Sequence, residues 1–198
     1  MEFKIFDLWP VSNVVVSDPG LKRYINLEPR LMPRSYGKLS KKRFAKTKMH
    51  IVERLIGFLQ VPGHRGKKHR IITEWSMGKF NKKVKLVIEV FKKIEAETKQ
   101  NPIQVLVNAI ENAAPHDEIT TIEYGGARYP VAVDTSPLRR LVLALRHMVW
   151  GAYDAAFNKK QTIADALAKE IILASKASPD SFAIKKKIEI EKQADSAR

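Results

Sequence analysis

The sequence predicts a mainly α-helical protein, a bundle of about six helices with one projecting β-hairpin between the third and fourth helices. Two observations carry this prediction. Apolar residues recur at helical spacing in several separate stretches of the chain. Between two of these stretches, residues 117–134 instead alternate like a two-stranded ribbon, with Gly125 and Gly126 at its turn.

The helices follow from their apolar spacing and from the signals that begin and end them. The third helix combines the N-cap residue Asn101, a proline at its first position and Gln104, which is placed to close a capping box. The fourth has the longest apolar face and is expected to be the central helix. The expected helices cover 48–60, 81–98, the stretch from Asn101 to before Pro115, 136–156, a segment capped by Thr162 and a last one opened by Ser178-Pro179.

The two turn glycines fix the register of the hairpin. The expected cross-strand partners are Tyr124 with Ala127, Glu123 with Arg128, Ile122 with Tyr129 and Thr121 with Pro130. Pro130 then lies at a non-hydrogen-bonded position, where the lack of an N–H leaves the ladder unbroken. Because an isolated hairpin buries too little to be stable alone, this one is expected to be an arm that a partner holds. The alternative is a hairpin folded down over its own helices.

Composition and charge bound the possible functions. The chain has 198 residues, 36 Lys and Arg against 21 Asp and Glu, and a net charge of +15. This excess indicates a polyanionic partner, either nucleic acid or an anionic membrane surface. No apolar run is long enough to span a membrane, the first residues make a poor signal peptide, and there is no cysteine. These features indicate a soluble cytoplasmic protein.

Two basic clusters stand out along the chain. Residues 34–48 contain seven Lys and Arg and no acid, and residues 61–85 contain eight with only Glu74 against them. We therefore divide the chain into a basic, partly irregular N-terminal extension, 1–48, and a helical domain, 49–198, that carries the arm at 118–134. The apolar core is expected to begin at Ile51, so that the extension could be removed without unfolding the bundle. The first cluster could also be a solvated tail, but Tyr36 and Phe44 among its cations favour RNA contact.

Several strings in the chain resemble the small-subunit ribosomal protein S-seven family. They follow one another through nearly the whole sequence, and the first of them is typical of the archaeal and eukaryotic branch. They are INLEPR (25–30), HIVERLI (50–56), KQNPIQVLVNAIENAAP (99–115), YGGARYPVAVD (124–134), SPLRRLVLALRHM (136–148) and AFNKKQTIADALAKEIILAS (156–175).

The resemblance implies a structural protein that binds the 3′ major domain of small-subunit rRNA, helps to nucleate assembly of the head and contacts neighbouring head and platform proteins. It also implies that the hairpin lies near the exit-site tRNA and the mRNA path, through Tyr124, Gly125, Gly126, Ala127, Arg128 and Tyr129. Arg139, Arg140, Arg146 and His147 lie off the apolar face of the fourth helix and share a basic face. The predicted rRNA-binding residues are Arg34, Lys38, Lys41, Lys42, Arg43, Lys46, Lys48, Arg65, Lys67, Lys68, Arg70, Lys82, Lys83, Lys85, Arg139, Arg140 and Arg146.

Other functions fit the sequence less well. A DNA-bending protein with a β-ribbon arm is the main alternative, but such arms are usually rich in Arg or Lys, and this ribbon has only Arg128. An enzyme acting on nucleic acid is disfavoured because no carboxylate cluster accompanies the basic clusters. The five histidines show no zinc-binding spacing and no G-x-x-x-x-G-K-[ST] phosphate loop occurs, so neither a metal nor a cofactor is expected.

Overall fold

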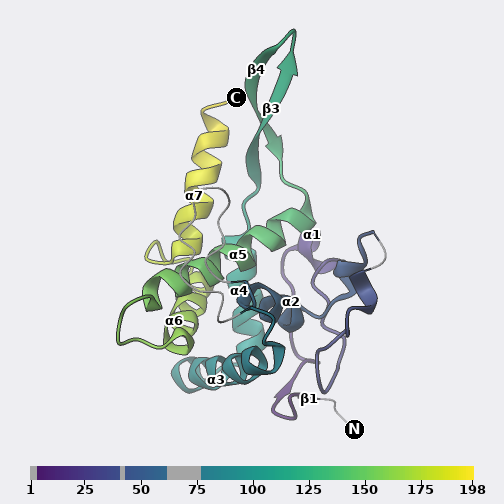
Figure 1. Cartoon of the computed structure of the whole chain (residues 1–198), viewed down its shortest axis with the longest axis vertical. Helices are drawn as coiled ribbons and strands as arrows, with labels where there is room; N and C mark the ends of the chain where they lie inside the picture. The colour runs from purple at the N-terminus through teal and green to yellow at the C-terminus, as the bar shows by residue number, and fades with distance from the viewer. Residues whose placement is uncertain (1–3, 41–42, 62–76) are drawn as a thin grey trace.

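A computed structural model describes residues 4–40, 43–61 and 77–198. Within these residues the protein is mainly helical, as predicted (Figure 1). The longer helices are α2 (Ile51–Leu59), α3 (Phe80–Thr98), α4 (Pro102–Ala113), α5 (Pro137–Ala156), α6 (Ile163–Ser175) and α7 (Phe182–Asp195). The shorter elements are β1 (Lys4–Ile5), β2 (Trp9–Pro10), α1 (Pro19–Lys22) and the 3₁₀ turns η1 (Lys38–Ser40) and η2 (Ala45–Lys48). The arm consists of β3 (Asp117–Tyr124) and β4 (Ala127–Asp134).

The helices pack around α5 and α6. Helix α5 contacts α1, α2, α4, α6 and α7, which agrees with its predicted central place, and α6 contacts α3, α4, α5 and α7. Close approach of α5 to the start of α7 depends on Gly151, where a Cβ would lie 2.6 Å from the Cβ of Phe182. Leu145 on α5 is fully buried in the resulting core.

The helix ends match most of the predicted capping signals, with two corrections. Asn101 caps α4 by accepting from the Ile103 N–H, and Thr162 caps α6 by accepting from the Asp165 N–H. Gln104 closes no capping box, because its side-chain amide instead bonds both the N–H and the carbonyl of Val15. Helix α7 begins after Ser181 rather than Ser178, since the Ser181 hydroxyl accepts from the Ile184 N–H.

The N-terminal segment belongs to the core, and the expectation that the core begins at Ile51 is wrong. The buried apolar residues of the segment are Ile5, Trp9, Val11, Leu21 and Ile25. The indole of Trp9 packs edge-on against Phe91, with ring centroids 5.5 Å apart, and donates to Glu95 at 2.9 Å. These residues escaped the sequence analysis because the segment is mostly extended and irregular, so its buried positions follow no helical period.

The β-hairpin projects from the bundle, as Figure 1 shows. Its strands pair in the predicted register, including Thr121 with Pro130. All residues from 121 to 130 are exposed, so the alternative of a hairpin lying on its own helices is excluded. The root of the arm lies beside α7 (Figure 1). Among the described residues, no helix is long and apolar enough to cross a membrane.

Candidate RNA-binding surface

The chain from residue 31 to Lys48 contains the first basic cluster and is called the basic segment below. It is held against α2 by polar contacts of two buried side chains. The Glu53 carboxylate accepts from both the N–H and the hydroxyl of Ser35, at 2.7 Å each. One helical position further on, Arg54 donates to the carbonyl of Lys46 at 2.6 and 3.0 Å and to that of Tyr24 at 3.3 Å. Hydrogen bonds to charged groups stabilise by about 1.5–3 kcal/mol each. These two neighbouring side chains therefore hold both ends of the basic segment against the bundle.

Burial lowers the pKa of two side chains in this attachment. Desolvation lowers the pKa of Arg54 to about 10, which still leaves the guanidinium charged at neutral pH. Desolvation, reinforced by the nearby Arg30, lowers the pKa of His50 to about 4. His50 is thus neutral at pH 7, and its Nδ1 accepts from the Val52 N–H as the N-cap of α2.

Aromatic rings contact two of the arginines in the basic segment. The Arg34 guanidinium lies 4.5 Å from the centroid of Tyr36 and 4.9 Å from that of Phe80, so it contacts both rings. Arg43 lies 4.8 Å from the ring of Phe44. Phe80 is the first residue of α3 and lies near the end of the second basic cluster, 61–85. Its contact with Arg34 therefore joins the first basic cluster to the end of the second cluster.

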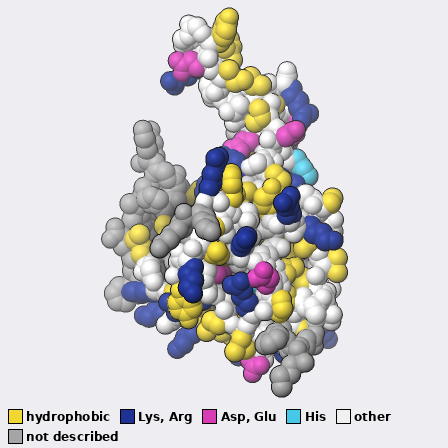
Figure 2. Space-filling view, turned by 90° about the vertical axis from the view of Figure 1, so that its right-hand side faces the viewer, with side chains coloured by type: hydrophobic (Ala, Val, Ile, Leu, Met, Phe, Trp, Pro, Cys, Tyr) yellow, Lys and Arg dark blue, Asp and Glu magenta, His cyan; other side chains and the backbone are white. Residues whose placement is uncertain are grey.

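Seven of the predicted cations in the first cluster and at the start of α3 are exposed. They are Arg34, Lys38, Arg43, Lys46, Lys48, Lys82 and Lys85. Lys83 is 7% exposed, and desolvation together with the neighbouring Lys79 lowers its pKa. Six further predicted residues, Lys41, Lys42, Arg65, Lys67, Lys68 and Arg70, lie outside the described residues. Figure 2 looks onto the side where the N-terminal segment lies in Figure 1 and shows Lys and Arg spread over it with few acids between them.

The expected basic face of α5 is not formed as predicted. Arg140 is 7% exposed and pairs with Asp18 at 2.9 Å, which joins α5 to the cap of α1. His147 is also buried, and desolvation, with Arg146 next, lowers its pKa to about 4. Arg146 is half-buried, 5.7 Å from the ring of Trp150, and only Arg139 is well exposed. The helical period separated these four residues from the main apolar face but could not show that α7 and the N-terminal segment cover two of them.

The root of the arm is held by ion pairs. Arg139 makes a two-pronged pair with Glu118, and Arg198 pairs with Asp117 at 2.7 Å. From α7, the Glu191 carboxylate accepts from the His116 N–H at 3.0 Å. The root is therefore braced by both α5 and the C-terminal end of the chain.

The tip of the arm is open to solvent. The side chains of Ile122, Tyr124 and Tyr129 are 50%, 82% and 55% exposed. Arg128 pairs with Glu123 across the strands at 3.5 Å, with Gly125 and Gly126 in the left-handed region as the turn and Ala127 beside them. The tip of the arm thus offers apolar and aromatic surface with little net charge. Within the described residues, no group of three or more His, Cys, Asp or Glu could hold a metal ion.

Comparison with known proteins places this molecule in a family. The family model described as Ribosomal protein S7p/S5e matches residues 21–198. The small ribosomal subunit protein uS7 of Nanoarchaeum equitans (strain Kin4-M) is 55% identical over 198 residues, which is 100% of each chain. The chain belongs to the ribosomal protein S7p/S5e family. The family predicted from the sequence is thereby confirmed, and this relative is an archaeal protein, in agreement with the predicted archaeal and eukaryotic branch.

As a member of the S7p/S5e family, this chain is a ribosomal protein with a structural rather than an enzymatic role. Sequence reasoning predicted the exposed cations of the first cluster but missed Glu53, Arg54 and Phe80, which fix the basic segment in place. A signal for the first two was present: they are the only charged residues in a short helix that is otherwise almost entirely apolar. Phe80 carried no such signal.

Proposed function

We propose that this protein is built into the small ribosomal subunit, where it binds the 3′ major domain of the rRNA and helps to nucleate assembly of the head. The observation that carries the proposal is the fixed basic surface formed by the described residues of the first cluster, 34–40 and 43–48, and the start of α3. Buried contacts from Glu53 and Arg54 hold the segment in place, so RNA binding requires little further ordering. The full-length match to a small ribosomal subunit protein also supports a location in the small subunit.

The surface suits RNA by its shape as well as its charge. A-form RNA has a major groove too narrow for side chains, so proteins recognise its phosphates, its 2′-hydroxyls and its unpaired bases. A rigid body that presents exposed cations and aromatic rings together fits this mode of recognition. The proposed phosphate contacts are the seven exposed cations of this surface and Arg139 and Arg146, together with the six predicted residues outside the described ranges. Lys83 and Arg140 are left out because they are buried.

The arm has a separate role in this proposal. Its tip, from Tyr124 to Tyr129, lies near the exit-site tRNA and the mRNA path, while the bundle and the basic surface bind rRNA and neighbouring head and platform proteins. Support comes from its projection away from the bundle and from its lack of unpaired cationic charge at the tip. A DNA-bending arm is disfavoured by the same observation, because such arms neutralise phosphates along their length.

Replacing residues 120–133 by a tight turn tests this division of labour. The bundle is expected to fold and most rRNA affinity to persist, since these residues contribute nothing to the buried core. The shortened protein should still co-sediment with small ribosomal subunits after a high-salt wash. The retention of exit-site tRNA by these subunits should differ from that of wild-type subunits. Failure of such subunits to assemble their heads would show that the arm is part of the scaffold. Wild-type tRNA retention and reading-frame fidelity would refute the role of the tip.

A further inference from the structure

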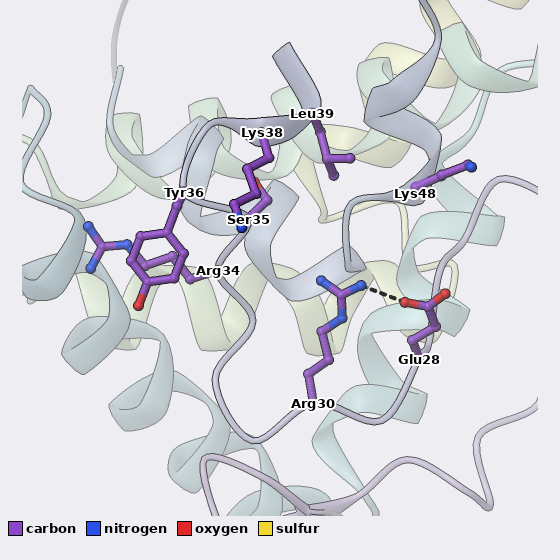
Figure 3. Close-up of a pocket in the computed structure, with 8 residues that line it drawn as sticks. All are labelled: Glu28, Arg30, Arg34, Ser35, Tyr36, Lys38, Leu39 and Lys48. Carbon is purple, nitrogen blue, oxygen red and sulfur yellow. Dashed lines mark hydrogen bonds and ion pairs between the residues drawn. The ribbon is translucent and has the colours of Figure 1, made fainter. Parts of the chain in front are cut away.

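A small pocket of roughly 350 Å³ opens within the basic segment (Figure 3). Its walls come from three stretches that are separate in the sequence: Glu28 and Arg30, residues 34–39, and Lys48. Four of the lining residues are cationic, Arg30, Arg34, Lys38 and Lys48, and Glu28 is the one acid among them. Its volume is near the low end of the range for small-ligand sites, so it suits one small group rather than an extended chain.

One wall of the pocket is an aromatic platform. The ring of Tyr36 is 72% exposed, and the Arg34 guanidinium lies 4.5 Å from its centroid and 4.9 Å from that of Phe80. The Tyr36 ring is therefore supported by Arg34, which Phe80 contacts in turn. Tyr36 has a φ of 51°, a left-handed conformation that side chains other than glycine rarely adopt. The bonds from Ser35 to Glu53 hold the preceding residue, so the buried attachment to α2 also fixes this platform. Backbone strain of this kind concentrates at ligand sites.

The other wall carries charge. Arg30 pairs with Glu28 through Nη2 at 2.6 Å, which orients the guanidinium while engaging one of its nitrogens. The backbone of Lys48 is fixed by Asn26, whose side-chain amide donates to the Lys48 carbonyl at 2.6 Å. In the view of Figure 3, Tyr36 and Lys48 lie on opposite sides of the pocket, with Arg30 between them.

We propose that this pocket holds one unpaired nucleotide of the bound RNA, with its base stacked on Tyr36 and its phosphate between Arg30 and Lys48. Unpaired bases that splay out of an RNA junction stack on aromatic side chains and arginine planes, and Lys and Arg bind their phosphates. An exposed aromatic ring and cations that line the same pocket provide both halves of that recognition. The inference rests on the proposed rRNA binding and adds a specific site to it.

The test measures the affinity of the full-length protein for a 3′ major-domain rRNA fragment over a series of salt concentrations. Tyr36→Ala should weaken binding by about 5- to 150-fold, the range that corresponds to one stacked base. The slope of log affinity against log salt should stay unchanged, because no charge is lost. Tyr36→Phe, which keeps the ring, should bind like wild type. Arg30→Gln should instead reduce the slope by about one, as expected for one lost phosphate contact.

Tyr129→Ala is the matched control, since it removes an equally large exposed tyrosine from the arm. It should leave affinity for the rRNA fragment unchanged. Ultraviolet crosslinking of the wild-type complex should further join Tyr36 to a single unpaired nucleotide. If Tyr36→Ala and Tyr129→Ala both bind like wild type while wild-type binding is tight, the pocket holds no base and the proposal is overturned, but the proposed function stands. If the wild-type protein does not bind the fragment, both are overturned.

Discussion

Loss of the Glu53 carboxylate should weaken both the fold and RNA binding. In Glu53→Ala, the N–H and hydroxyl of Ser35 each lose a charged acceptor at 2.7 Å while they stay buried. At about 1.5–3 kcal/mol for each bond, the free energy of unfolding should fall by about 3–6 kcal/mol. A double-mutant cycle with Ser35→Ala isolates the hydroxyl bond, and its coupling energy should be about 1.5–3 kcal/mol in urea unfolding experiments.

The effect on RNA affinity has an unexpected sign. Removal of an acid from a protein that binds a polyanion would by charge alone raise affinity. We expect Glu53→Ala to lower it, because the segment around Ser35 must then be ordered at the moment of binding. Ordering one residue costs about 1–2 kcal/mol, which corresponds to about 5- to 30-fold in affinity.

Glu97→Ala provides the matched control, because it removes an exposed acid of α3. It should change stability by no more than about 0.5 kcal/mol and should leave RNA binding equal or slightly tighter. The reasoning would be refuted by a coupling energy below about 0.5 kcal/mol, or by a Glu53→Ala variant that binds rRNA as tightly as the Glu97→Ala variant.

Three further predictions concern stability. Leu145→Ala should lower the free energy of unfolding by roughly 2–5 kcal/mol through a cavity in the core, measured by urea unfolding. Trp9→Ala should cost about 3–5 kcal/mol in the same assay, and a loss below about 1 kcal/mol would show that the N-terminal segment is not part of the core. His50 and His147 have pKa values near 4 in the folded protein, below the ordinary 6.5, so the unfolded chain takes up protons first as the pH falls. Each histidine should contribute about 3 kcal/mol that is present above pH 6.5 and is lost toward pH 4, and unchanged stability over this window would contradict their burial.

The helices and the arm could be predicted because their signals are local. The spacing of apolar residues in α3 or α5 and the Gly125-Gly126 turn depend only on residues close in sequence. The register of the arm followed from the same turn, down to the pairing of Thr121 with Pro130.

The partners that hold the N-terminal segment and the basic segment could not be predicted, because these contacts join distant residues. Trp9 reaches Glu95, and Arg34 contacts Phe80, across sequence separations that carry no periodic signal. Charge alone was also misleading: Arg140 looks like a surface cation in the sequence, yet it is buried against Asp18. The pocket beside Tyr36 could not be predicted either, because its walls come from three stretches that only the fold brings together.

The most direct test of the central claim compares two polyanions. The affinity of the protein for a 3′ major-domain rRNA fragment should be measured against that for a DNA duplex of the same length, at matched salt and over a salt series. We expect tighter binding to the rRNA fragment, with a loss on the order of 10³-fold or more between 50 and 200 mM salt if 6–10 phosphates are contacted. Equal affinity for the DNA duplex would contradict the account, because it would show that the surface recognises charge alone and not the shape of RNA.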